Sequence, residues 1–180
     1  MSVLSTLPAG SFTIDPSHSR IGFSARHAMV TKVRGAFNEF AGSGSLANGA
    51  GSVTVDISVD SIDTRSADRD GHLKSPDFFD ASNFPKITFA STSVKDSGSE
   101  KVVVEGNLTI KDVTKPIAIT FEYTGAATDP FGNARVGFEG EAEINRKDFG
   151  LTWNAALETG GILVSENIKL EFEISAIAAK

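Results

Sequence analysis

Residues 102–110 read Val-Val-Val-Glu-Gly-Asn-Leu-Thr-Ile, and apart from Val103 their side chains alternate between apolar or small and polar. Successive side chains of a β-strand point to opposite faces, so this stretch predicts a strand with one dry and one wet face. The same rhythm returns four more times, at residues 53–59, 117–123, 136–144 and 168–174. Five amphipathic strands are therefore predicted with the same kind of inner face.

Three further stretches with weaker alternation predict strands at about 20–26, 35–46 and 86–94. Turn-forming residues such as Asn48-Gly49 and Ser97-Gly98 separate the strands. Connections this short favour antiparallel neighbours, because a parallel crossover needs a dozen or more residues. About eight such strands can close into a barrel without exposed edges. The predicted fold class is therefore all-β, an extended eight-stranded antiparallel β-barrel.

Residues 61–85 interrupt the alternation and contain the one good helix candidate, from about Ser66 to Lys74. Asp68 and Asp70 suit its first turns and Lys74 its last, where the helix dipole favours them. A second short turn is expected at Ser75, followed by Pro76. We expect this segment to form a lid over one end of the barrel.

The 180 residues suit one ordinary domain, expected at 11–178 after a flexible N-terminus at 1–10. The formal charge of −6 gives no positive field for nucleic acid, and Arg146-Lys147-Asp148 resembles a solvated surface. No apolar run is long enough for a membrane span, and the first ten residues predict no export signal, so a cytoplasmic location is expected. The absence of cysteine excludes thiolate chemistry and disulfides.

Several blocks outside the alternating stretches carry a family resemblance through their order and spacing. The chain resembles the YceI-like family of lipocalin-like polyisoprenoid-binding proteins over nearly its whole length. The blocks are Asp15-Pro16-Ser17-His18-Ser19, Phe23, His27, Lys32-Val33-Arg34-Gly35, Phe37, Arg69, residues 72–80, Phe84-Pro85, Phe89, residues 106–110, Thr114-Lys115-Pro116, residues 129–133 and residues 145–153.

The resemblance implies an elongated lipocalin-like barrel around an apolar pore that holds a polyisoprenoid or another long-chain lipid. It also implies a homodimer in many members and no established catalytic role. Many relatives carry an export signal, whereas none is visible in this chain, which puts a role with periplasmic lipids in doubt. No cofactor is expected. No metal site is expected either, because the three histidines lie in separate segments without a ligand-type spacing.

The candidate ligand-binding residues fall into two groups. Twelve are inward positions of strands, where Gly106, Gly140 and Ala142 are expected to leave room: Ile21, Phe23, Val55, Ile57, Phe89, Val104, Leu108, Ile119, Phe121, Phe138, Leu170 and Phe172. The others come from segments without alternation near the expected lid, together with His27 at a strand end as a polar contact: Phe37, Phe40, Phe78, Phe79, Phe84, Phe149 and Trp153.

Alternation alone leaves two interiors open, one filled by side chains and one that holds a ligand. Three hypotheses follow. The preferred one is a non-enzymatic protein that binds, sequesters or transports a polyisoprenoid, an isoprenoid quinone or a similar lipid. The alternatives are a lipid-modifying enzyme that uses His27 and a filled barrel that acts only through protein association.

Overall fold

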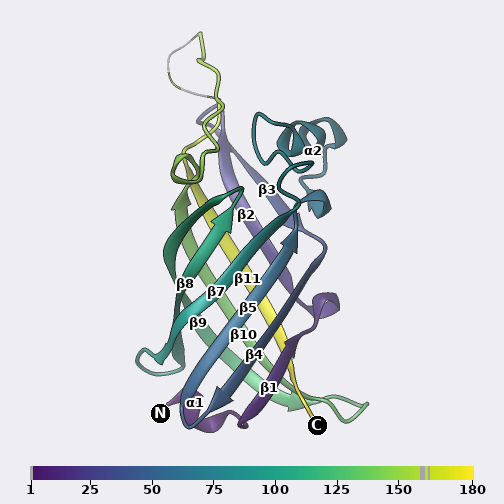
Figure 1. Cartoon of the computed structure of the whole chain (residues 1–180), viewed down its shortest axis with the longest axis vertical. Helices are drawn as coiled ribbons and strands as arrows, with labels where there is room; N and C mark the ends of the chain where they lie inside the picture. The colour runs from purple at the N-terminus through teal and green to yellow at the C-terminus, as the bar shows by residue number, and fades with distance from the viewer. Residues whose placement is uncertain (1, 159–160, 162) are drawn as a thin grey trace.

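A long antiparallel barrel makes up the body of the molecule (Figure 1). The structure is a computed structural model, and it describes residues 2–158, 161 and 163–180. The helical elements are short: α1 (Val3–Thr6), η1 (Pro16–His18), η2 (Val59–Ser61), α2 (Ala67–Lys74) and η3 (Arg146–Phe149). The strands are β1 (Gly10–Ile14), β2 (Arg20–His27), β3 (Thr31–Phe37), β4 (Phe40–Ala47), β5 (Ala50–Ser58), β6 (Ile62–Asp63), β7 (Lys86–Asp96), β8 (Lys101–Ile110), β9 (Val113–Thr128), β10 (Ala134–Asn145) and β11 (Asn167–Ala178).

Eight of these strands form a closed ring in the order β1-β4-β5-β7-β8-β9-β10-β11, and β11 pairs back to β1. All of the pairings are antiparallel, as the short connections predicted. The ring thus confirms the predicted all-β fold class, the eight-stranded antiparallel barrel.

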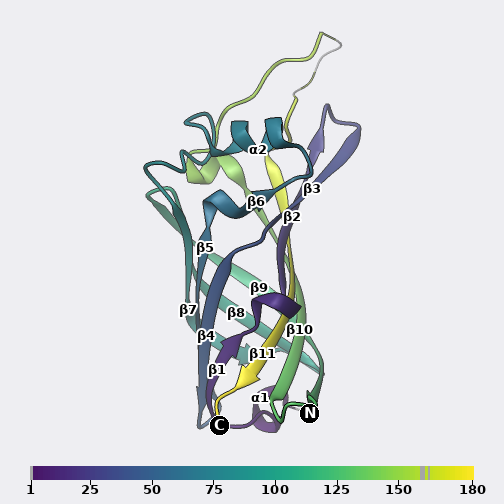
Figure 2. The ribbon, with the colours of Figure 1, turned by 90° about the vertical axis from the view of Figure 1, so that its right-hand side faces the viewer.

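Strand β11 has two partners on one side, which makes the wall branch. Its C-terminal part pairs with β1, where Ala176 lies opposite Ile14, and its N-terminal part pairs with β2, where Leu170 lies opposite Phe23. From β2 the sheet continues through β3 to β6. The β2–β3 hairpin therefore forms the wall toward one end and projects beyond it (Figure 2).

The predicted strand at 35–46 is wrong in one respect, because two strands stand there. Phe37 and Phe40 are both buried, although residues three apart in an unbroken strand face opposite sides. The chain resolves this conflict with a break at Asn38 and Glu39. Asn38 N donates to Ser61 O, and Ser58 N donates to Glu39 O, so the broken strand stays hydrogen-bonded to the segment after β5.

Both ends of the barrel are covered. Helix α2 begins after the N-cap Ser66, as predicted, and with the turn that follows it lies over one end (Figure 2). We call residues 67–85 the lid and this end the lid end. The opposite end, the base, carries α1 and both chain termini (Figure 1). Val3 and Leu4 of α1 are buried there, where the sequence predicted a flexible N-terminus.

Glycines on the inner wall do not leave free space, contrary to the expectation. A Cβ on Gly106 would lie 2.5 Å from Cζ of Phe89, and one on Gly140 would lie 2.5 Å from Cδ1 of Phe121. Gly35 is covered in the same way by Phe23. Each aromatic ring thus lies close against backbone that has no side chain, an approach that only glycine permits.

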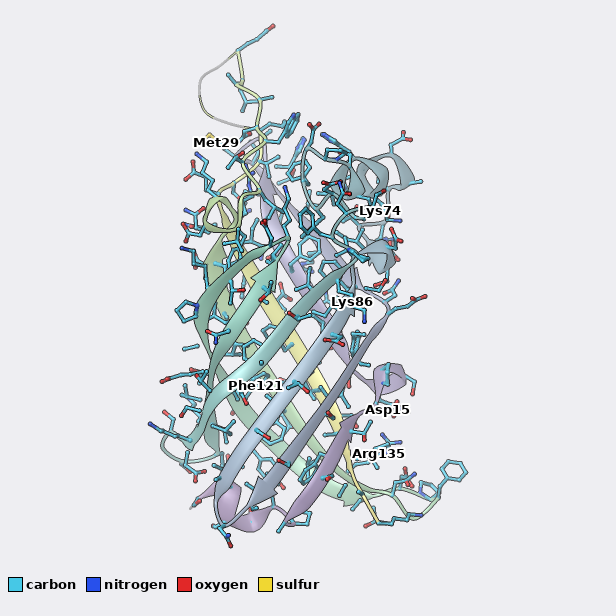
Figure 3. The ribbon with its side chains drawn as sticks, viewed as in Figure 1. Asp15, Met29, Lys74, Lys86, Phe121 and Arg135 are labelled. Carbon is cyan, nitrogen blue, oxygen red and sulfur yellow. The ribbon has the colours of Figure 1, made fainter. Side chains whose placement is uncertain are left out.

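Two family blocks meet on the outer wall near the base. Arg135 Nη1 donates to Asp15 Oδ2 at 2.7 Å, and its Nε donates to Asp129 Oδ2 at 2.8 Å (Figure 3). Arg135, with help from Ser17 and His18, holds the pKa of Asp15 well below its usual range. The backbone N–H of Asn133 and the guanidinium of Arg135 do the same for the pKa of Asp129.

Replacing Arg135 with glutamine should destabilise the protein most at neutral pH. Depressed carboxyl pKa values give stability that is present above the unfolded pKa, about 3.9, and is lost as pH falls through the folded value. The difference between wild type and R135Q should therefore shrink below about pH 4 in denaturant unfolding measured over a pH series. A K86Q control, which breaks an exposed pair with Asp56, should change little at any pH. A difference in the free energy of unfolding between wild type and R135Q that stays constant down to low pH would contradict this account.

Candidate functional site

The interior of the barrel contains an apolar cavity of about 340 Å³. Every strand of the ring contributes to its wall, and α1 and the lid contribute at the two ends. Arg146 is the one charged residue that lines it among the residues described. The inner wall therefore offers shape and hydrophobic contact to a ligand, with few hydrogen-bonding groups.

Most of the predicted ligand-binding residues line this cavity. They are Ile21, Phe23, Phe37, Val55, Ile57, Phe78, Phe79, Phe89, Val104, Leu108, Ile119, Phe121, Phe138, Leu170 and Phe172. Two aromatic groups stand out among them. The ring of Phe121 lies 6.3 Å from that of Phe138 and 5.8 Å from that of Phe172. Nearer the lid, Phe37 lies 5.7 Å from Phe23 and 6.0 Å from Phe79.

Five predicted residues do not line the cavity. Phe40 and Phe149 are buried in the surrounding core, and Trp153 and Phe84 are partly buried. His27 is exposed at the end of β2, bridges to Val164 and is not among the residues that line the cavity. Its imidazole therefore has no contact with the cavity in this structure.

Other lining residues were missing from the predicted set. Phe12 and Ile14 come from β1, whose alternation covers only five residues, and Leu4 and Leu7 come from the segment expected to be flexible. Leu73 comes from the lid. The pattern around β1 was present in the sequence but too short to separate from chance, whereas nothing in the sequence marked Leu4 and Leu7 as cavity residues.

Arg146 is buried, which overturns its interpretation as part of a solvated surface. Only 4% of the residue is exposed. Its Nη1 donates to Leu151 O at 2.6 Å and Trp153 O at 2.9 Å, its Nε to Ser165 O at 2.9 Å and its Nη2 to Val164 O at 3.2 Å. Burial lowers the pKa of the guanidinium. The side chain thus fastens the two arms of the loop between β10 and β11 to each other.

The lid is attached to this loop through an aromatic cluster. The imidazole of His72 lies 4.7 Å from the ring of Trp153 and 5.1 Å from that of Phe78, in both cases edge to face. His72 Nε2 also bonds Asp77 Oδ2 at 2.9 Å, and the guanidinium carbon of Arg146 lies 5.9 Å from the centre of the Phe78 ring. Lid, loop and Arg146 therefore form one connected closure, which we call the latch.

The closed ring, its apolar interior and its two covered ends define a class of protein, an antiparallel barrel built around a hydrophobic cavity. The chain belongs to the family described as the YceI-like domain, whose model matches residues 12–176. It is 41% identical over 148 residues to a UPF0312 protein of Vibrio cholerae, covering 79% of this chain and 78% of the relative. A UPF0312 protein of Staphylococcus aureus is 40% identical over 164 residues, covering 89% and 93%.

Solved structures share the fold. BcnA of Burkholderia cenocepacia superposes with a TM-score of 0.78 at 23% identity, covering 90% of this chain and 98% of that chain. A YCEI protein of Campylobacter jejuni gives 0.74 at 28% identity, with 86% and 90% covered. A polyisoprenoid-binding domain from Saccharophagus degradans gives 0.72 at 14% identity, with 96% and 100% covered. The Campylobacter jejuni protein carries the family name that the sequence resemblance implied. The Saccharophagus degradans domain is described as polyisoprenoid-binding.

Proposed function

We propose that this protein binds, sequesters or transports a long lipophilic molecule inside the barrel, such as a polyisoprenoid, an isoprenoid quinone or a similar lipid. The observation that carries the proposal is the apolar cavity, which is lined by residues from every strand of the ring. Membership of the YceI-like family and the fold shared with a polyisoprenoid-binding domain support it.

The volume of the cavity agrees with a ligand rather than with a packing defect. Cavities of about 150 Å³ already admit benzene, and ligand pockets usually begin at about 300 Å³. At the same cavity volume per carbon atom as for benzene, 340 Å³ accommodates on the order of a dozen carbon atoms. At about 0.8 kcal/mol for each buried CH₂, such a segment contributes roughly 10 kcal/mol before the cost of association. A longer lipid requires side chains or the lid to move aside.

A catalytic role has less support than a binding role. A lipid-modifying enzyme would need an acid, base or nucleophile within reach of the bound molecule. His27 is exposed and does not line the cavity, so it supplies no acid or base there. Arg146 donates its hydrogen bonds to backbone carbonyls. Among the described residues, no three His, Asp or Glu side chains gather as metal ligands would.

Solvent extraction of the purified protein followed by mass spectrometry tests the proposal. We expect a lipid with a long hydrocarbon chain in amounts comparable with the protein. Protein purified from several hosts should yield such a lipid in each case, and recovery of none from any host would contradict the proposal. Incubation of the loaded protein, with the lipid mass followed over time, separates binding from turnover, because a carrier leaves the lipid unchanged.

A further inference from the structure

The tip of the β2–β3 hairpin exposes two large apolar side chains. Met29 is 64% exposed and Val30 is 75% exposed. Ala28 and Met29 have φ angles of 50° and 61°, a tight left-handed turn that presents both side chains outward. Figure 3 shows Met29 at the lid end of the molecule, and Figure 2 shows the hairpin projecting beyond the barrel wall.

The hairpin is held in place by the loop between β10 and β11. Ala28 N donates to Leu163 O at 2.7 Å, and Ser165 N donates to Arg26 O at 3.1 Å. Arg26 N in turn donates to Ser165 Oγ at 2.9 Å. The exposed tip is therefore supported by hydrogen bonds to the loop, and the Met29 side chain lies against Gly161 of the same loop.

Basic side chains lie on the two strands of this hairpin and beside them. From residue 20 to residue 38 the chain contains four cations and no carboxylate. Lys32 and Arg34 of β3 share one surface depression with Arg65, which lies between β6 and α2, and with Arg69 of α2. These four and Arg26 are exposed, and no carboxylate of the described residues lies within 4.0 Å of their charged atoms. We call these five residues the basic collar.

The rest of the surface carries the opposite charge. The whole chain has a net charge of −6, and glutamates occupy the outward positions of β10 and β11. The collar therefore differs in charge from the outer face of β10 and β11. An anionic surface attracts the collar and repels the glutamates of β10 and β11.

We propose that the hairpin end docks on an anionic lipid bilayer, with Met29 and Val30 entering the head-group layer and the basic collar lying against the phosphates. The apolar tip with the basic collar behind it matches a bilayer, where an apolar interior lies behind a layer of negatively charged head groups. Nucleic acid offers no apolar layer for the tip. The proposal stands on the hairpin and the collar and does not depend on what the barrel holds.

Sedimentation with vesicles tests the docking. Wild-type protein should bind vesicles of phosphatidylcholine and phosphatidylglycerol in equal parts more strongly than vesicles of phosphatidylcholine alone, and high salt should weaken the binding. M29S/V30S should partition about tenfold or more weakly. K32Q/R34Q should lose about fivefold for each charge, or roughly twenty-fivefold together. Circular dichroism should show all variants folded, because the changed side chains are exposed.

Matched controls come from the base. Phe131, 82% exposed between β9 and β10, and Lys95 and Lys101, which flank the connection between β7 and β8, offer the same chemistry at the other end. F131S and K95Q/K101Q should bind vesicles like wild type. The proposal is overturned if wild type does not bind anionic vesicles, if the hairpin variants bind as wild type does, or if the base variants weaken binding equally.

A fluorescent label gives a second measurement that needs no loss of binding. The chain has no cysteine, so M29C or F131C introduces a single thiol. A polarity-sensitive dye at position 29 should shift to the blue when anionic vesicles are added, whereas the same dye at position 131 should not. A shift at position 131 alone would show that the opposite end enters the bilayer and would overturn the proposal.

Discussion

Replacing Arg146 with leucine is expected to lower the free energy of unfolding by about 3–5 kcal/mol. The change removes four hydrogen bonds from a charged donor and leaves the carbonyls of Leu151, Trp153, Val164 and Ser165 without that partner. Hydrogen bonds to charged groups contribute about 1.5–3 kcal/mol each, and partial relaxation of the loop recovers some of the loss. Denaturant unfolding followed by circular dichroism measures the effect.

The neighbouring residue provides the control. Lys147 forms an exposed ion pair with Glu166 at 2.7 Å, and such surface pairs contribute about 0–1 kcal/mol. K147L should therefore unfold nearly like wild type, although it removes the same charge one position away. R146K should fall between the two, because an ammonium group cannot reach all four carbonyls. A loss below about 1 kcal/mol in R146L would contradict the structural role of the latch.

Filling the cavity should abolish most ligand binding while the barrel stays folded. Val104 and Ile119 lie opposite each other on β8 and β9, and both line the cavity. The double variant V104F/I119F places two phenyl rings where a hydrocarbon chain would lie. Exclusion of one five-carbon unit costs up to about 4 kcal/mol, which weakens binding by up to about a thousandfold. Lipid recovered by extraction, normalised to protein, reports the change.

The outward neighbours on the same strands supply the control. Val103 lies opposite Thr120, and neither residue lines the cavity. V103F/T120F adds the same rings to the outer face and should retain lipid like wild type. Overpacking of the interior costs typically about 1–3 kcal/mol, so melting curves must accompany the extraction. Equal lipid recovery from the folded inward variant and its control would argue that the ligand lies elsewhere.

Much of the wall was predictable because the barrel has one physical requirement repeated along the chain. Each strand must turn one face toward the interior, and that requirement leaves a period of two in the sequence. The long strands β8, β9, β10 and β11 carried the pattern over enough residues to be found. β1 did not, because only Phe12 and Ile14 of its five residues face the cavity.

The features that were not predicted from the sequence depend on contacts between distant segments. Arg146 sits beside Lys147 and Asp148 and has the composition of a surface turn, but its partners are backbone carbonyls, which every residue possesses and no sequence pattern marks. The break at Asn38 and Glu39 likewise follows from the need to bury both Phe37 and Phe40. The burial of Leu4 depends on the barrel end to which α1 attaches, and Asp96 Oδ1 accepts a hydrogen bond from Leu4 N there.

The pairing of inward glycines with phenylalanine rings bears on which lipids the barrel can hold. Phe23, Phe89 and Phe121 each lie against bare backbone, so turning a ring toward or away from the axis meets no branched neighbour beneath it. The usable length of the channel is then set by side-chain rotamers and not by the hydrogen-bonded wall. Under the proposed function, such a cavity would adapt to hydrocarbon tails of different lengths, which favours recognition of a chemical class over discrimination among its members.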